Sequence, residues 1–452
     1  MRDLSPAPGT RWEPRQPLPS IKPPPATPQP TTADAFSLAE LTEYALRNNP
    51  RARQAWFAAR AAAAGVGIEE ADLLPQVTGG ASFTRLRPVS GTTTQASSPQ
   101  TRWGPTVTLS FVLFDFGARM DQVRAAEYRL LAANLNQNRA LQDIVFQVEQ
   151  SYYRLLGLDL LVRVNELTLR NIRTSLDAAN RRRESGLATV ADVYRTETQV
   201  AQAELNLTRS RGELEKARGQ LAAAVGLPPN NVLKVQTLPD VPQVRQMTET
   251  VDQLLERARQ SRPDLVAAEA QARAARAAAL AASKAWLPTI DVTATGGRTL
   301  LLDSSSVDRR IPGATSWQFA LNLRMPLFDG FREKYSSRQA QALAEQADAS
   351  RDVLYRQTEL DVWQAYYDVQ TAATATGSTE AQVKSAEQTA QATFARYQAG
   401  FGSILDLLTA QLDESNARVQ RIQSYLDWYT ALARLNFSAG FNDIVAAAAQ
   451  NK

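Results

Sequence analysis

Two aspartates, Asp192 and Asp406, stand out as residues whose position could give them a chemical role. Each lies six positions after a glycine, Gly186 or Gly400, at which a long helical pattern ends. The next helix is expected to begin near each aspartate, where the helix dipole favours a carboxylate whether or not it has another function. Asp and Glu are plentiful elsewhere, but no carboxylate pair is set apart as a general acid and base, and we find no phosphate-binding loop.

The composition argues against an enzyme and against a nucleic-acid-binding protein. The 452 residues include no His, the commonest general base and metal ligand, and no Cys, so thiol chemistry and disulfides are excluded. With 50 basic and 46 acidic residues the net charge is +4, too small an excess to indicate nucleic acid as a partner. We therefore expect no catalytic activity, no cofactor and no bound metal.

The N-terminal region shows no signal for membrane insertion. No stretch of the chain reaches the roughly 20 apolar residues of a membrane-spanning helix. The first residues, MRDLSPAPGTRWEPRQPLP, lack the apolar core of a signal peptide. Either the protein is cytosolic or an export signal has been removed from this sequence, and composition does not separate the two. Prolines crowd residues 5–35 and predict an extended arm over 1–36.

The chain contains an internal repeat, detected as an ordered set of matches between its two halves. The offset is 213 positions before the strand hairpin and 214 after it. Matched pairs are Leu41 with Leu254, Pro50 with Pro263, Gly186 with Gly400, Asp192 with Asp406, and Gly226 with Gly440. We expect a first repeat over 37–227, a linker over 228–249, a second repeat over 250–441 and a tail over 442–452.

Each repeat is expected to contain a helix, a hairpin of two strands and two further helices. In the first repeat we predict a helix over 37–73, strands over 76–85 and 105–114, and helices over 118–184 and 188–226. The second hairpin is expected over about 289–326, with a polar loop near 299–315. The longest helix has a coiled-coil seam that includes Val145, Val148 and Tyr152. The two shorter helices together match its length and could lie end to end beside it.

The predicted strands alternate apolar and polar side chains. The apolar members of the two clearest strands are Val107, Leu109, Phe111, Phe319, Leu321 and Leu323. About ten residues suffice for a strand to cross a bilayer, and this alternation fits a membrane barrel with its apolar side chains toward lipid. An ordinary antiparallel sheet packed on helices would show the same pattern.

Four strands cannot close a barrel, because the smallest membrane barrels have about eight. A symmetric oligomer removes open strand edges, and three copies would supply twelve strands. The predicted fold is therefore mainly α with a small β part. Duplicated long antiparallel helices form an α-barrel tunnel, and four strands per chain contribute to a twelve-stranded transmembrane β-barrel in a trimer.

Four motifs occur at defined places in the repeats: ALRNNPRARQA in the first repeat, Leu-Pro before each hairpin, LFDFG and LFDG after each hairpin, and RYQAGFGSILDLLTAQ at the last turn. With these motifs the sequence resembles the TolC family of bacterial outer-membrane efflux and secretion channels, also called outer membrane factors. The resemblance covers the chain from about Ser37 to Gly440. It implies a homotrimer in the outer membrane whose helical tunnel extends into the periplasm.

The resemblance also implies partners and site residues. An inner-membrane transporter would pass substrate through a periplasmic adaptor (membrane fusion) protein, and outer-membrane lipid would surround the strands. The adaptor would contact the helical tips at Gly186, Leu187, Gly400, Phe401, Gly402 and Ser403. Asp406 matches a position that helps form a constricted entrance, and Asp192 is its repeat counterpart. Thr409 and Gly402 depart from members that carry a second Asp and an Arg there.

We thus predict a passive trimeric export duct of a tripartite efflux or type I secretion system. The alternative is a soluble coiled-coil scaffold with a local sheet, which would need no detergent. An arginine cluster before the first tip, which includes Arg173 and Arg182, is either a solvated helix face or a contact for acidic groups of the adaptor or the cell wall. The exported substrate, whether drug, metal ion or polypeptide, cannot be read from the sequence.

Overall fold

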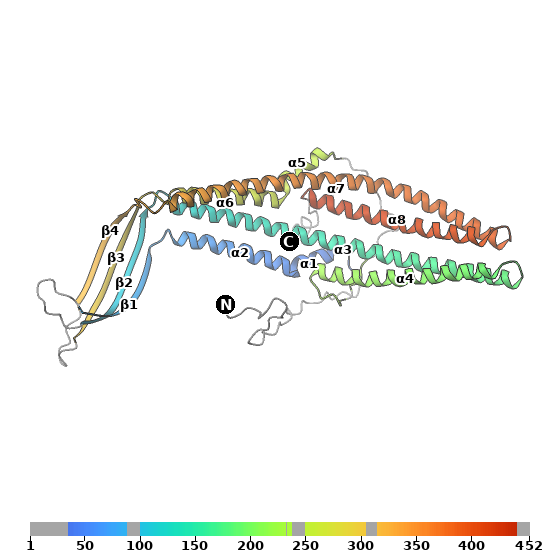
Figure 1. The fold of residues 1–452 in the computed structure, drawn as a ribbon, viewed down its shortest axis with the longest axis horizontal. Coiled ribbons are helices and arrows are strands. Elements are labelled where there is room, and N and C mark those ends of the chain that lie inside the picture. The colour runs from blue at the N-terminus through green and yellow to red at the C-terminus, as the bar shows by residue number, and fades with distance from the viewer. Residues whose placement is uncertain (1–34, 88–99, 232, 237–248, 304–313, 441–452) are drawn as a thin grey trace. The chain divides into compact units, whose positions relative to one another are not determined.

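The computed structural model describes residues 35–87, 100–231, 233–236, 249–303 and 314–440. The predicted arm up to residue 34, the predicted tail and both hairpin loops lie outside these ranges. Within them, the two halves carry the same elements in the same order (Figure 1). The first half contains α1 (Leu38–Asn48), α2 (Pro50–Ala71), β1 (Gln76–Leu86), β2 (Gln100–Phe114), α3 (Ala118–Glu184) and α4 (Val190–Val225). The second half contains α5 (Val251–Ser261), α6 (Pro263–Ser283), β3 (Thr289–Asp303), β4 (Ala314–Arg324), α7 (Arg332–Gln398) and α8 (Ile404–Ser438).

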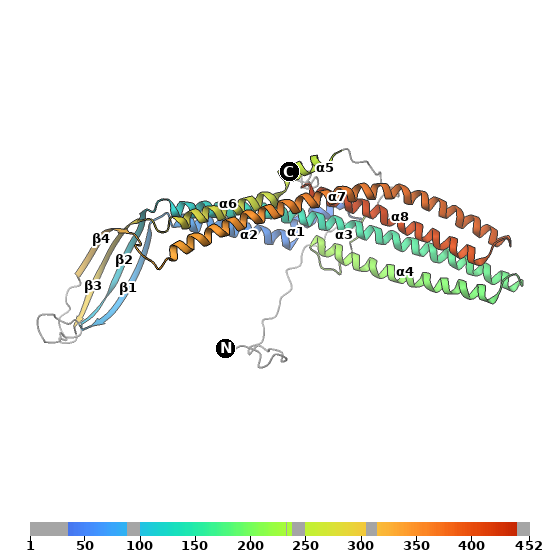
Figure 2. The same ribbon diagram turned by 45° about the horizontal axis from the view of Figure 1, so that its top comes forward.

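The two longest helices, α3 and α7, each span 67 residues, about 100 Å at 1.5 Å per residue. The bounds of α3 are those predicted from its sequence pattern. The part of α3 near the sheet packs against α2 and α6, and the remainder packs against α4 and α8 (Figures 1 and 2). The shorter helices therefore lie end to end beside the long one, as predicted. None of the described helices contains a stretch long and apolar enough to cross a membrane.

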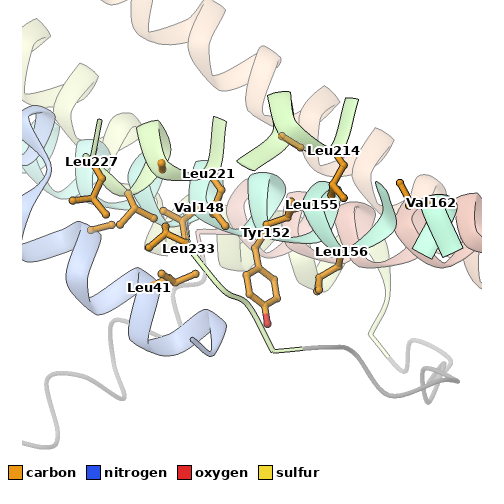
Figure 3. Close-up of a cluster of buried hydrophobic side chains, with 14 of the residues drawn as sticks. Leu41, Val148, Tyr152, Leu155, Leu156, Val162, Leu214, Leu221, Leu227 and Leu233 are labelled. Atoms are coloured by element: carbon orange, nitrogen blue, oxygen red, sulfur yellow. The ribbon is translucent and has the colours of Figure 1, made fainter. Parts of the chain in front are cut away.

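A hydrophobic cluster forms where α1, α3 and α4 meet (Figure 3). Val148 and Tyr152 of α3 pack there with Leu41 of α1 and Leu221 of α4. These four side chains are at most 5% exposed. The Tyr152 hydroxyl also donates a hydrogen bond to the carbonyl of Gln236 at 3.1 Å, which ties the segment 233–236 to α3. The coiled-coil seam predicted for α3 is thus a buried stripe of the helix.

The single helix predicted over 37–73 is wrong, because the structure contains two helices there. Asn49 is extended, and Pro50 is the first residue of α2. A residue before proline is disfavoured in the helical region, and proline has no N–H for the preceding turn. The Asn49 side chain accepts a hydrogen bond from the Arg51 amide and donates one to the Ala224 carbonyl, both at 2.9 Å. The break therefore caps α2 and ties it to the end of α4, and it recurs before Pro263.

The four strands form one antiparallel sheet in the order β1-β2-β3-β4 (Figure 1). β2 begins at Gln100 rather than at 105, and β3 continues to Asp303, so both strands are longer than predicted. β2 passes through Pro105, which has no N–H to donate to a neighbouring strand. The β2–β3 pairing stops at Trp103 and resumes at Thr106, so the missing donor falls in a local interruption of the ladder.

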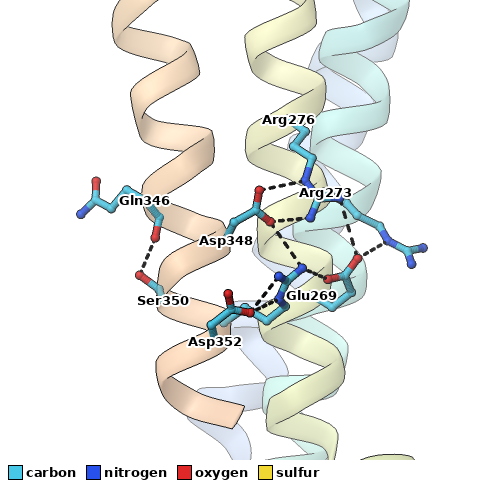
Figure 4. A network of polar contacts seen from close by, with 8 residues as sticks. Glu269, Arg273, Arg276, Gln346, Asp348, Ser350 and Asp352 are labelled. Atoms are coloured by element: carbon cyan, nitrogen blue, oxygen red, sulfur yellow. Dashed lines mark hydrogen bonds and ion pairs between the residues drawn. The ribbon is translucent and has the colours of Figure 1, made fainter. Parts of the chain in front are cut away.

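Ion pairs fasten α6 to α7 (Figure 4). Glu269 of α6 accepts hydrogen bonds from Arg273 at 2.8 Å and from Arg351 of α7 at 2.9 Å. Arg276 of α6 is paired in turn with Asp348 of α7, at 3.2 Å from its Nε. The hydrogen bonds from Arg351 and Arg273 lower the pKa of Glu269. Single exposed pairs contribute little, but a linked set helps to hold two long helices in register.

Candidate functional site

Two tight turns connect each long helix to the helix that returns beside it. Gly186 and Gly400 both have a positive φ, +74° and +90°, in the left-handed region that favours glycine. The Leu187 amide donates to the Arg182 carbonyl at 2.8 Å, and the Phe401 amide donates to the carbonyl five residues before it at 2.9 Å. This is the hydrogen bond of a Schellman helix end. Leu187 and Phe401 are 68% and 80% exposed, so each turn presents one large apolar side chain.

The remaining predicted tip residues, Gly402 and Ser403, complete the second turn. A Cβ on Gly402 would approach the backbone nitrogen of Tyr397 to 3.2 Å, which leaves little room for a side chain. The Ser403 hydroxyl accepts a hydrogen bond from the Asp406 amide at 3.1 Å and so caps α8. The structure thus explains the residue types of this turn, while its contact with an adaptor stays a prediction.

Asp192 and Asp406 occupy the same position, the third residue of α4 and of α8, but their carboxylates differ. The Asp192 carboxylate accepts hydrogen bonds from the amide and the hydroxyl of Thr189 at 3.0 and 2.8 Å. These bonds lower the pKa of Asp192 and complete a capping box. Within the described residues the Asp406 carboxylate is exposed and has no such partner, and Thr409 is exposed one turn further on. Asp192 therefore acts as a cap, and an entrance role for any of the three stays a prediction.

Across the two turns, Arg182 of α3 reaches Tyr397 near the end of α7. Its guanidinium carbon lies 4.6 Å from the centroid of the Tyr397 ring, and Nη1 donates to the Tyr397 carbonyl. Nη2 donates to the Leu187 carbonyl at 3.4 Å. Tyr397 is 2% exposed and packs in a cluster with Val193 and Leu407. Arg182 therefore contacts both turns.

Arg182 was predicted to belong to an arginine cluster that either is solvated or contacts acidic groups of other molecules, so its contact with Tyr397 was not predicted. Another member of the cluster, Arg173, pairs with Glu204 at 2.6 Å with both side chains about half exposed, as expected of a solvated face. No local pattern distinguishes the two arginines, because the partner of Arg182 is 215 positions away.

The pairing of the four strands places their apolar residues on one face of the sheet. Val77, Leu109, Ala294 and Phe319 lie opposite one another across the four strands. Residues directly opposite share a face, and steps of two along a strand keep to it. All six side chains predicted to face lipid fall on this face, which we call the apolar face: Val107, Leu109, Phe111, Phe319, Leu321 and Leu323.

The opposite face, which we call the hydrophilic face, carries hydroxyl, amide and carboxyl groups. The Thr108 and Thr295 hydroxyls lie 3.4 Å apart, and the Asn322 amide donates to Asp291 at 2.8 Å. On the apolar face, by contrast, Phe319 and Leu323 are 64% and 72% exposed. The alternation predicted from the sequence is thus present in the sheet, while contact of the apolar face with lipid stays a prediction.

The half-buried carboxyl of Glu149 lies in the helical part. Burial raises the pKa of Glu149 of α3 to about 7. One turn further on, Tyr153 stacks on Tyr429 of α8 with ring centroids 4.8 Å apart, and burial together with Glu149 raises the pKa of Tyr153. These groups belong to the packing between α3 and α8. Among the described residues, no group of three or more acidic side chains is arranged to hold a metal ion.

Comparison with known proteins assigns these features to a family. The family model for outer membrane efflux proteins matches residues 41–227 and 254–440, one match in each half. Protein CyaE of Bordetella pertussis is 29% identical over 402 residues, covering 88% of this chain and 82% of CyaE. The proteases secretion protein PrtF of Dickeya chrysanthemi is 26% identical over 428 residues, covering 90% and 89%. The CmeC outer membrane channel of Campylobacter jejuni matches with a TM-score of 0.80 at 18% identity over 91% and 88% of the two chains, which shows a common fold.

These matches confirm the resemblance read from the repeat and its motifs. They also confirm the predicted fold of one chain, mainly α with a small β part, because its long helices and one sheet of four antiparallel strands match the fold of these channels. The chain therefore belongs to the outer membrane efflux protein family, and its place is the bacterial outer membrane and the adjoining periplasm.

Proposed function

We propose that the protein is a passive trimeric export duct, the outer-membrane component of a tripartite efflux or type I secretion system. The proposal rests mainly on the structure of the sheet. The sheet has one apolar and one hydrophilic face, and within the described residues β1 and β4 are each paired on one side only. In lipid, such edges would leave backbone groups unpaired at several kcal/mol each. Three chains placed edge to edge would form a closed barrel of twelve strands.

The helices supply further surfaces that a second chain could cover. α2 has one buried residue, Ala59, and packs mainly on α3, while Trp56 and Ile68 are 46% and 68% exposed. α7 exposes Val353 and Leu360, seven positions apart, which is the spacing of a coiled-coil seam. Exposed apolar side chains of this kind are typical of a helix surface that becomes buried on assembly. The proposed trimer would bury it.

The proposed partners follow from family membership and from the exposed turns. A periplasmic adaptor would contact the turns through side chains such as Leu187 and Phe401, and an inner-membrane transporter would deliver the substrate through that adaptor. The Asp406 carboxylate would lie at the entrance of the duct. The relative PrtF is a proteases secretion protein, whereas the family is named for efflux, so the proposal covers polypeptides and small molecules alike.

Analytical ultracentrifugation of the full chain, in detergent and again after detergent removal, tests the assembly. We expect a particle of three chains in detergent, aggregation once the detergent is removed, and pores in planar bilayers. A monomer or dimer that stays in solution without detergent would overturn the proposal. That result would instead favour a soluble coiled-coil scaffold with a local sheet.

A further inference from the structure

The apolar face of the sheet carries two charged side chains at the end remote from the helices. Among the described side chains of that face, the charged ones are Arg85 of β1 and Arg298 of β3. Arg85 lies two residues beyond Phe83, which is paired with Trp103 of β2. Arg298 lies one row beyond the row that contains Trp317 of β4. Each arginine is therefore one row further from the helices than a tryptophan.

The two arginines occupy equivalent positions. Each is the tenth residue of its strand, counted from the end next to the helices. They are 213 positions apart, the offset at which Leu41 matches Leu254, so they are counterparts in the internal repeat. A strand needs about 9–11 residues to cross the hydrocarbon layer, and tryptophans are enriched at its boundary. In the proposed assembly both guanidinium groups would therefore reach the headgroups of the outer leaflet.

Neither arginine has an acidic partner among the described residues, and both side chains are exposed. Their cross-strand neighbours, Thr101 and Thr315, carry no charge. An arginine on a lipid-facing surface costs about 2–4 kcal/mol at the bilayer midplane and about 0–1 kcal/mol near the interface. In the proposed assembly the two unpaired arginines therefore lie near the membrane interface, where anionic headgroups are available to pair with them.

We propose that Arg85 and Arg298 bind the phosphate groups of lipids in the outer leaflet of the outer membrane. A guanidinium matches a phosphate with two parallel hydrogen bonds. The apolar rows beside each arginine would contact the acyl chains of the same lipid, which a free phosphate ion cannot do. In a trimer, six such positions would encircle the sheet. The inference rests on the proposed function, because it requires the apolar face to contact lipid.

The proposal can be tested by measuring how tightly fluorescently labelled lipid A binds to the full chain in detergent, with fluorescence anisotropy as the readout. We expect bisphosphorylated lipid A to bind more tightly than the same lipid without its phosphates. Arg85→Gln and Arg298→Gln should each weaken binding at their site about fivefold. Arg85→Lys and Arg298→Lys should retain much of the affinity because they keep the charge. Arg324→Gln, on the hydrophilic face, is the matched control and should leave the affinity unchanged.

Several results would overturn the proposal. These are equal binding of the two lipid forms, an unchanged affinity in the Arg85→Gln/Arg298→Gln double variant, or an equal loss in Arg324→Gln. Competition by millimolar inorganic phosphate would assign the site to a free anion instead of a lipid. Sedimentation of each variant as the wild-type particle shows that it is folded. The double variant also distinguishes failure of this proposal from failure of the proposed function. If it still forms trimers and pores, the export duct is supported whether or not the lipid site exists.

Discussion

The guanidinium of Arg182 lies over the ring of Tyr397, 4.6 Å from its centroid, and joins the end of α3 to the end of α7. Two polar atoms at this contact, Arg182 Nε and the Tyr397 hydroxyl, are buried without a hydrogen-bond partner among the described residues. The contact therefore depends on the ring face and on the hydrogen bond to the Tyr397 carbonyl. It holds the two turns of one chain together.

Replacing Arg182 with Ala should loosen both turns. The variant loses a cation–π contact and a charge-assisted hydrogen bond, together about 2 kcal/mol. Hydrogen exchange of the amides at 182–187 and 397–403 measures the effect, and we expect faster exchange in both segments. Tyr397→Phe is the control, because it keeps the ring and removes only a hydroxyl without a partner. Loosening by Tyr397→Phe as large as that by Arg182→Ala would contradict this account.

Asp192 and Asp406 should respond differently to replacement by Asn. Asp192→Asn weakens the cap of α4 by up to about 1 kcal/mol and should speed amide exchange in its first turn. Because the folded pKa of Asp192 is lowered, its contribution is present above pH 3.8 and is lost as the pH falls through the folded value. Asp406→Asn removes no carboxylate hydrogen bond and should change exchange less, while pores should become less cation-selective, as measured by reversal potential. A pore phenotype confined to Asp192→Asn would contradict the proposed entrance.

The two faces of the sheet should differ in their tolerance of charge. Leu109→Arg places a charge on the apolar face near the middle of the membrane span and should lower stability by about 2–4 kcal/mol, whereas Leu323→Arg, second from the end of β4 next to the helices, should lower it by about 0–1 kcal/mol. Thr108→Arg and Asn322→Arg, one residue away on the hydrophilic face, should have mild effects. Urea unfolding of the protein in lipid vesicles measures the four variants. Equal effects at all four positions would exclude lipid contact by the apolar face.

Glu149 should make stability depend on pH near neutrality. Burial raises its pKa from the ordinary 4.5 to about 7. Between these values the folded protein keeps a proton that the unfolded chain has released, so stability falls as the pH rises from 4.5 to 7 and is then constant. Glu149→Gln should therefore stabilise the protein by up to about 3 kcal/mol at pH 8 and leave it unchanged at pH 4. Urea unfolding at the two pH values measures this, and equal shifts would argue against a buried carboxyl.

The elements that were predicted correctly depend on local periodicity. α3 was located from Ala118 to Glu184 because an uninterrupted seam defines both its length and its buried stripe. Two errors came from proline. Pro50 was read as part of one helix, although the residue before it is restricted to extended conformations. Pro105 was predicted to begin a strand, but β2 passes through it. The strand can do so because the β2–β3 pairing is interrupted at Pro105, where its missing N–H is not needed.

The site was less accessible to prediction from the sequence. Thr189 and Asp192 have the same spacing as Ser403 and Asp406, and each pair reads as a helix cap. Only the structure shows that the first carboxylate closes a capping box whereas the second does not. The partner of Arg182 lies in the other half of the chain, so no local pattern points to it.

The two open edges, β1 and β4, also bear on how such a protein matures in the cell. A lone chain could enter the bilayer only by carrying unpaired N–H and C=O groups into the hydrocarbon. Under the proposed assembly, insertion therefore waits for the encounter of three chains. The rate of channel formation would then rise with a high power of the concentration of unassembled chains.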